Sequence, residues 1–285
     1  MHKNRIIAVD ATNIASRLFF SMYYKEKSVP TLELAAEKII TYINSLILKH
    51  NMEYVISAFD LNGSDYRKSI YPDYKAGRED NPARKWFVCL FKHVMECYGI
   101  KTIDADGIEA DDIIATFITK FTKRTDEENR IVILTSDKDY NQLISPRSII
   151  YFPNKQMYLN IKGFRTLYGF EPKMFPVLQA MIGDKVDNIP RCLPKGIGEV
   201  SIKYFLSRYD TMESLLNWIN GASDQISEYV KENLSTFELN LKLTTLLTDI
   251  DLSIESIDEC RIKHDHKKNI YKEIMSYGEY IPELD

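Results

Sequence analysis

The sequence of 285 residues is poor in the residue types that mark disordered or membrane-spanning chains. It has 11 glycines and 10 prolines against 45% apolar residues, which excludes a disordered, collagen-like or linker-rich chain. Its uninterrupted apolar runs, such as Ile131 to Leu134, fall far short of the roughly 18 to 20 residues that span a bilayer. The sequence therefore predicts a globular protein, long enough for a main domain with a smaller helical appendage.

Cysteine and histidine are also scarce. The five histidines are dispersed, and no Cys-x-x-Cys pair occurs among the four cysteines, which are Cys89, Cys97, Cys192 and Cys260. This spacing excludes a zinc site built from cysteine and histidine. No signal-like segment precedes the first apolar run, so we expect reduced cysteines and a cytoplasmic location, in a bacterial cell or an infected host cell.

An excess of positive charge is absent too. With 37 Lys and Arg against 41 Asp and Glu, the net charge is −4, which as an average argues against a nucleic-acid partner. The average does not show where the acids lie, and their positions are more informative than their number.

Three short β-type runs end in carboxylates. The runs cover residues 6–9, 54–59 and 131–136, and the acids at their ends are Asp10, Asp60, Asp137 and Asp139. Between the first two runs, residues 32–50 carry apolar side chains at helical spacing. This alternation predicts a parallel sheet covered by helices, with ligands bound outside the carboxyl ends of the strands.

Two further acidic groups bring the count to nine carboxylates in five groups: Glu109, Asp111 and Asp112 before an apolar helix, and Asp184 with Asp187. For any one acid, a solvated surface position or a helix cap is the simpler explanation. Acids from several strand ends, however, would repel one another in one crevice unless cations neutralised them. Ligands that are all oxygen select hard cations, so the pattern favours two or more Mg²⁺ or Mn²⁺ ions and phosphodiester chemistry.

Taken together, these segments resemble the 5′-nuclease family of flap endonucleases, phage 5′-exonucleases and the amino-terminal nuclease domain of bacterial DNA polymerase I. The matching pieces occur in family order over most of residues 5–210. They are IIAVDATN (6–13), SAFD (57–60), YPDYKAGR (71–78), GIEADD (107–112), TSDKDYNQL (135–143), MIGDKVDNIP (181–190) and KGIG (195–198). GIEADD together with GDKVDNIP is the specific part of the resemblance.

The resemblance implies a divalent-metal-dependent 5′-3′ exonuclease and flap endonuclease. Its substrates would be branched or 5′-ended DNA and RNA/DNA hybrids, in replication or repair. The family pattern implies two metal clusters, one of Asp10, Asp60, Glu109 and Asp111, the other of Asp112, Asp137, Asp139, Asp184 and Asp187. All nine acids of that pattern are present, which argues against a relative that binds DNA without cutting it.

The resemblance also assigns basic residues to the substrate. Lys75 and Arg78 match family residues that contact the scissile phosphate, so we expect them to be catalytic together with Asp10 and Asp111. Arg17 resembles a family arginine that touches substrate phosphate, and its alternative is an ordinary surface arginine. For Tyr74 two interpretations stay open, stacking on a base and plain packing.

Residues 193–201 resemble the hairpin of a helix-hairpin-helix. Gly196 and Gly198 would let the backbone approach a phosphate, and Lys195 and Lys203 would supply charge. The segment is about two residues longer than the common family form, and an ordinary turn between helices is the alternative.

We therefore expect an α/β fold with a central, mainly parallel sheet and helices on both faces. The expected domains are a catalytic domain over residues 1–174, with a helical arch at about 70–100, a helix-hairpin-helix subdomain over 175–250, and a C-terminal segment over 251–285 that packs on the core. We expect a monomer that works with replication proteins and without a membrane. Two rival interpretations are a PIN-like RNase, which would lack the 183–198 region, and a catalytically silent DNA-junction-binding scaffold, which would have lost acids.

Overall fold

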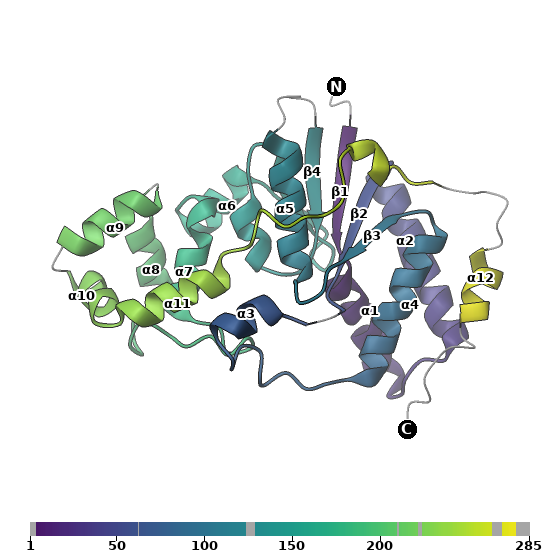
Figure 1. Cartoon of the computed structure of the whole chain (residues 1–285), viewed down its shortest axis with the longest axis horizontal. Coiled ribbons are helices and arrows are strands. Elements are labelled where there is room, and N and C mark those ends of the chain that lie inside the picture. The colour runs from purple at the N-terminus through teal and green to yellow at the C-terminus, as the bar shows by residue number, and fades with distance from the viewer. Residues whose placement is uncertain are drawn as a thin grey trace.

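A computed structural model describes residues 4–61, 63–123, 129–209, 211–221, 224–263 and 270–277. Its centre is a six-stranded sheet in the order β3-β2-β1-β4-β5-β6 (Figure 1). The strands are β1 (Asn4–Asp10), β2 (Tyr54–Phe59), β3 (Lys101–Asp104), β4 (Asn129–Leu134), β5 (Ser148–Phe152) and β6 (Met157–Leu159). All neighbouring pairs are parallel except β5 and β6, which are antiparallel. The predicted mainly parallel sheet is confirmed.

Burial on both faces explains why the central strands are almost entirely apolar. Every residue of β2 is buried. Along β1, Ile6 and Ala8 pack into one hydrophobic core, and Ile7 and Val9 pack into the other. Successive strand residues point to opposite faces, so a strand covered on both sides needs apolar residues at every position.

Helices cover the two faces as predicted. On one face lie α1 (Ala11–Glu26), α2 (Leu32–His50), α4 (Pro82–Cys97) and α12 (Ile270–Tyr277). On the other lie α5 (Ala110–Lys123), α6 (Ile161–Tyr168) and α7 (Phe175–Ile182). Three short 3₁₀ segments complete this part: η1 (Asp139–Leu143), η2 (Pro172–Met174) and η3 (Ile257–Cys260).

A helical lobe extends from one side of the sheet, at the left of Figure 1. It contains α8 (Glu199–Leu206), α9 (Met212–Gly221), α10 (Gln225–Glu232) and α11 (Leu234–Thr244). Helix α11 packs on α7, where the Asn240 side-chain amide donates to the carbonyl of Ala180 at 2.9 Å and the Thr244 hydroxyl donates to the carbonyl of Pro176 at 3.0 Å. This lobe is the helical subdomain expected after the sheet.

The segment predicted as an arch divides into two parts. Residues 71–81, which follow α3 (Asp65–Ile70), contain no helix or strand. Helix α4, by contrast, buries Trp86, Phe87 and Phe91 against the sheet layer. The apolar face of α4 is occupied by the core, so the predicted arch borders the cavity through residues 71–81 and through Arg84 in the first turn of α4.

The chain returns to the sheet after α11. The backbone N–H of Ile262 donates to the carbonyl of Glu53 at 2.9 Å, and that of Lys263 donates to the carbonyl of Gly99 at 3.0 Å. Ile254, Cys260 and Ile274 are buried. The rest of the predicted C-terminal segment, residues 264–269 and 278–285, lies outside the described residues. No described helix has the length and apolar character needed to cross a bilayer.

The close approach of Gly99 to the backbone of Lys263 allows a test of how tightly the returning segment packs. Its φ is +70°, and a Cβ atom would lie 2.3 Å from the carbonyl oxygen of Lys263. We expect Gly99→Ala to lower the free energy of unfolding by about 1–3 kcal/mol, measured by urea denaturation. The control is Gly77→Ala, because a Cβ atom there meets nothing within 4 Å. Equal effects of the two substitutions would contradict this account of Gly99.

Candidate active site

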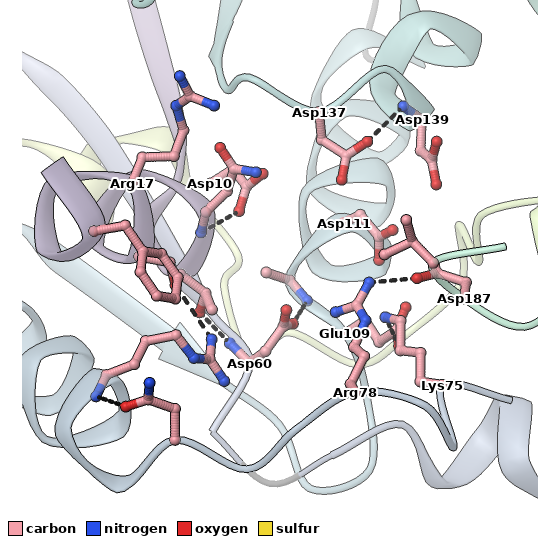
Figure 2. Close-up of a pocket in the computed structure, with 18 of the residues that line it drawn as sticks. Asp10, Arg17, Asp60, Lys75, Arg78, Glu109, Asp111, Asp137, Asp139 and Asp187 are labelled. Atoms are coloured by element: carbon pink, nitrogen blue, oxygen red, sulfur yellow. Dashed lines mark hydrogen bonds and ion pairs between the residues drawn. The ribbon is translucent and has the colours of Figure 1, made fainter. Parts of the chain in front are cut away.

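A cavity of about 700 Å³ opens at the carboxyl ends of the parallel strands (Figure 2). Seven of the nine predicted acids line it: Asp10, Asp60, Glu109, Asp111, Asp137, Asp139 and Asp187. The predicted cations Arg17, Lys75 and Arg78 line the same cavity. Residues from distant parts of the sequence thus meet in one place.

The sheet order explains why the acids converge. Strands β1, β2 and β4 are neighbours, and an acid follows or ends each of them. Asp10 ends β1 and caps α1, since its carboxylate accepts from the N–H of Asn13 at 3.3 Å. Asp60 follows β2 and accepts from the backbone N–H of Ala110, which joins the end of β2 to the start of α5. Asp137 accepts from the N–H of Asp139 at 2.9 Å in the turn after β4.

Burial and neighbouring carboxylates raise the pKa values of several of these carboxyl groups. Burial, with the neighbouring Asp137 and Asp60, raises the pKa of Asp10 to about 8, although a hydrogen bond from Thr135 at 2.6 Å opposes the shift. Burial likewise raises the pKa of Asp60 to about 6 and that of Asp139 to about 7. The pKa of Asp111 is raised well above its ordinary value by burial and by the adjacent Asp112 and Glu109. A cation placed among these groups would relieve the cost of ionising them.

Two cations offset the acids on the side of residues 71–81. Lys75 forms an ion pair with Glu109, and Arg78 forms one with Asp187. Burial alone would raise the pKa of Glu109, but Lys75 and Arg67 outweigh it and hold that pKa below its usual value. The same pair with Glu109 raises the pKa of Lys75 despite burial, so the ammonium group stays charged.

The backbone around Lys75 is held by the turn at 184–190. Lys75 has a φ of +57°, which is unusual for a residue with a side chain. Its N–H donates to the carbonyl of Asp187 at 2.9 Å, and the side-chain amide of Asn188 donates to the carbonyl of Asp73 at 2.8 Å. These bonds link the segment after α3 to the connection between α7 and α8.

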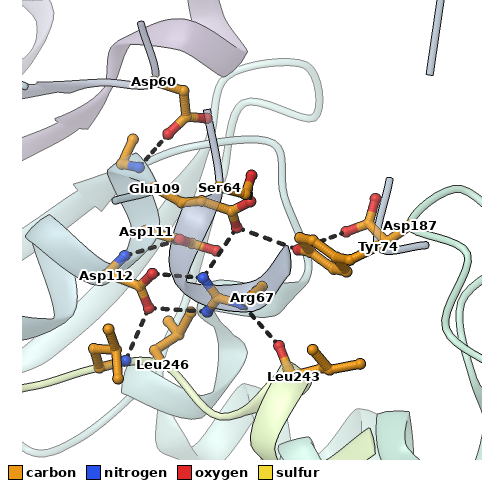
Figure 3. Close-up of polar contacts among 12 residues, drawn as sticks. Asp60, Ser64, Arg67, Tyr74, Glu109, Asp111, Asp112, Asp187, Leu243 and Leu246 are labelled. Carbon is orange, nitrogen blue, oxygen red and sulfur yellow. Dashed lines mark hydrogen bonds and ion pairs between the residues drawn. The ribbon is translucent and has the colours of Figure 1, made fainter. Parts of the chain in front are cut away.

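Arg67 is the site residue that sequence reasoning missed. Its side chain is 2% exposed and binds Asp112 through both terminal nitrogens, at 2.5 and 2.9 Å (Figure 3). The same guanidinium lies 3.1 Å from Glu109 and donates to the carbonyl of Leu243 at 2.9 Å. In the sequence, Arg67 lies among polar residues of a short helix, and no pattern there indicates burial.

Three of the predicted residues lie outside the cavity lining. Asp112 is fully buried, is paired with Arg67, accepts from the N–H of Leu247 at 2.8 Å and is not part of the cavity lining. Asp184 also lies off the cavity lining, paired with Lys138 at 2.9 Å. Tyr74 is 3% exposed and donates to Glu109 at 3.2 Å, so its ring has no face open to a base. The roles of Asp112 and Asp184 as metal ligands stay predictions, and for Tyr74 the structure favours packing over stacking on a base.

The predicted hairpin lies between α7 and α8. Lys195, Gly196 and Gly198 are exposed, and a Cβ atom at either glycine would meet nothing within 4 Å. Gly198 caps the start of α8 without a side-chain hydrogen bond to the free N–H groups. Lys203 is paired with Glu199 at 2.7 Å, which reduces the charge it offers.

The residues present fit divalent cations. The donors around the cavity are carboxylate oxygens, which hard cations such as Mg²⁺ prefer. One oxygen each of Glu109, Asp111 and Asp112 lies within 4.8 Å of the others. The hydroxyl of Tyr140, a buried residue of the cavity lining, has no hydrogen-bond partner among the described residues. Crowded acids and an unpaired hydroxyl are what a hydrated cation would satisfy.

A parallel sheet with carboxylates at its strand ends, faced by cations, defines the class of nuclease-like domains that bind divalent metals and phosphate. Two adjacent family models match the chain. The 5′-3′ exonuclease N-terminal, resolvase-like domain matches residues 5–169, and the 5′-3′ exonuclease C-terminal SAM fold matches residues 170–268. The chain therefore belongs to the 5′-3′ exonuclease family, as its sequence motifs indicate.

Individual relatives support this family assignment. The chain is 29% identical over 254 residues to a 5′-3′ exonuclease of Aquifex aeolicus, covering 88% of this chain and 84% of that protein. It is 29% identical over 261 residues to the thermostable DNA polymerase I of Thermus thermophilus, covering 89% of this chain. The chain spans only 30% of the length of that polymerase.

Among solved structures, the bacteriophage T5 flap endonuclease has the same fold. A crystal structure of that phage protein with metal ions aligns with a TM-score of 0.70 at 17% identity, covering 96% of this chain and 100% of that one. A complex of a variant phage enzyme with DNA and metal ions aligns with a TM-score of 0.68 at 17% identity, covering 97% and 100% of the two chains.

The raised pKa values predict how protons and metal compete. The pKa values of Asp10, Asp60 and Asp139 are higher than those of free carboxyl groups, so we expect these side chains to carry protons at pH 6 in the metal-free protein. A bound cation must displace those protons. Mg²⁺ affinity should therefore increase between pH 6 and 8, with proton release that is largest at the acid end. Calorimetry in two buffers of different ionisation enthalpy measures that release. Asp10→Asn should reduce it, and binding without proton release at pH 6 would refute the argument.

Proposed function

We propose that the protein is a divalent-metal-dependent, structure-specific 5′ nuclease that hydrolyses phosphodiester bonds near the 5′ ends of DNA, as 5′-3′ exonuclease and flap endonuclease. The observation that carries the proposal is the cavity in which seven carboxylates meet Lys75 and Arg78 at the strand ends. Membership of the 5′-3′ exonuclease family supports it.

The acids would hold Mg²⁺ or Mn²⁺, two or more ions. Asp10, Asp60, Glu109 and Asp111 form the group nearest β1, β2 and α5, and Asp137, Asp139 and Asp187 form the group nearest η1 and the α7–α8 connection. Asp112 and Asp184 would act by fixing their neighbours. When bound, such ions neutralise the carboxylates and stabilise charge on the attacking and leaving oxygens of a phosphate.

Lys75 and Arg78 would bind the phosphate opposite the acids. Each is paired with a carboxylate that lines the cavity. A phosphate entering the cavity would give both cations a second anionic partner, and charge developing on its oxygens would strengthen that interaction. The left-handed backbone at Lys75, fixed by the Asp187 carbonyl, positions the ammonium group for this role.

The duplex would be held elsewhere. The exposed glycines and Lys195 before α8 offer backbone N–H groups and charge to a phosphate backbone without reading sequence. Arg17, exposed at the rim of the cavity, would contact a phosphate near the site of cleavage. We further propose that RNA/DNA hybrids are substrates, that the enzyme acts as a monomer with replication proteins, and that it acts in the cytoplasm.

The two rival functions are less well supported. A PIN-like RNase has no use for the helical lobe, which the SAM-fold family model covers. A silent scaffold does not need seven carboxylates around one cavity, because their repulsion is costly unless cations bind.

The deciding experiment follows a labelled 5′-flap duplex, a single strand and an RNA hairpin with and without Mg²⁺. We expect cleavage of the flap duplex near its junction in Mg²⁺ or Mn²⁺ and none in EDTA. Asp111→Asn should abolish cleavage but retain binding, while Asp249→Asn, at an exposed position outside the cavity lining, should cut normally. Cleavage that persists in EDTA, or that is confined to the hairpin, would refute the proposal.

Lys75→Met tests the role of the cation near the phosphate. Methionine keeps most of the length of the side chain and removes its charge, so we expect the single-turnover rate at saturating enzyme to fall about 10²- to 10³-fold. The dissociation constant for the flap duplex should change much less. Lys68→Met, at an exposed position outside the cavity lining, is the control. An unchanged rate with weakened binding would instead place Lys75 on the binding surface.

A further inference from the structure

The cavity continues beyond the acids along helix α1. Its lining includes Asn13, Arg17, Phe20 and Tyr24, which are three or four residues apart and therefore share one face of the helix, together with the neighbouring Tyr23. The same helix begins at Asp10, in the acidic part of the cavity. One rigid element thus runs from the proposed metal site to a group of aromatic side chains.

These aromatic side chains are exposed but well ordered by stacking. Tyr24 is 71% exposed and Tyr23 37%. The ring of Tyr24 stacks on Phe20, with centroids 5.8 Å apart and planes at 22°, and that of Tyr23 stacks in the same way on the buried Phe19 at 5.7 Å. Core packing does not explain two tyrosines that neither hydrophobic core includes. Their open ring faces are available to a ligand with a flat apolar surface.

Cations lie between the acids and the aromatic rings. Arg17 is three residues before Phe20 on the cavity face, and Arg84 of α4 reaches the same face, where it donates to the hydroxyl of Ser16 at 3.2 Å. Glu79 and Asp80 also line the cavity, and Asp80 is paired with Lys85 at 2.8 Å. Arg17 and Arg84 would therefore meet a phosphate backbone that passes next to α1.

Arginines beside stacked aromatic rings fit one class of ligand, a single-stranded nucleic acid. Cations take the phosphates, and each unpaired base offers a ring face for stacking. A base inside a duplex has both faces covered by its neighbours, so the interior of a duplex arm cannot use this surface.

We propose that Phe20, Tyr23 and Tyr24 form a base-stacking subsite for unpaired nucleotides of the strand to be cut. The subsite would favour 5′ flaps over flush ends and would not depend on base sequence, because every base has a π face. The proposal rests on the proposed nuclease function for the identity of the strand, while the stacking itself can be measured without cleavage.

The test compares three ligands in Ca²⁺: a duplex with a 5′ flap of normal nucleotides, the same duplex with an abasic flap, and the duplex without a flap. The abasic flap keeps the phosphates and removes the bases. Tyr24→Ala should weaken binding of the normal flap by about 5- to 100-fold and leave the other two ligands within about two-fold of wild type. Tyr24→Phe, which keeps the ring, should bind as wild type does.

The control is Tyr271→Ala on α12, where the tyrosine is 47% exposed and lies outside the cavity lining. An equal loss on all three ligands would overturn the proposal, because it would place Tyr24 on the duplex or in the fold. An unchanged affinity for the normal flap would overturn it as well. Failure of the nuclease proposal would be seen separately, as absence of Mg²⁺-dependent cleavage of the 5′-flap duplex by the wild-type protein.

Discussion

Repulsion among buried carboxylates is the constraint on which this structure depends. Parallel strands bring the ends of β1, β2 and β4 to one edge, and the acids there are largely removed from water. Burial, and after it the neighbouring carboxylates, opposes ionisation of Asp10, Asp60 and Asp139 and raises their pKa values. The surrounding structure holds these acids together. Backbone N–H groups in the first turns of α1 and α5 donate to Asp10 and Asp60, and the hydroxyl of Thr135 also donates to Asp10. Lys75 and Arg78 form ion pairs with two further acids.

Arg67 connects the buried acids to the helical lobe. It neutralises Asp112 and Glu109 at the start of α5, and it also binds the carbonyl of Leu243 at the end of α11. A buried arginine with unpaired donors would be costly, as would a buried aspartate without its arginine. The start of α5 and the end of the helical lobe are therefore held in a fixed relation. The connection from α7 to α8, which leads into the helical lobe, also reaches the site, because the carbonyl of Asp187 accepts from the N–H of Lys75.

Sequence patterns predicted the parts of this arrangement that local chemistry determines. The apolar run at 54–59 coincides with β2, and the acids that follow such runs lie at the strand ends as expected. Strand β3, with every residue half-exposed, and the short β6, with Met157 and Tyr158 exposed, lack a continuous apolar run and gave no comparable signal. The burial of Arg67 and Asp112 also escaped prediction, because each has the other as its partner, more than 30 residues away in the sequence. Residue spacing identifies carboxylates near a strand end but does not separate those that face a cavity from those that face an arginine.

Helix α1 also fixes the spacing between an acid, a cation and an aromatic side chain of the cavity lining. Asp10 caps its first turn, Arg17 lies in the middle and Tyr24 lies near its end, so their order and separation are those of a rigid rod rising about 1.5 Å per residue. Residues on a helix keep such spacing more closely than residues on a loop, because the backbone hydrogen bonds fix every position relative to the next. If a strand lies along this face, its reacting phosphate and its unpaired bases are bound at a fixed distance from each other. The fixed spacing along the helix would then determine the position of cleavage relative to the unpaired bases, and this position would not depend on base sequence.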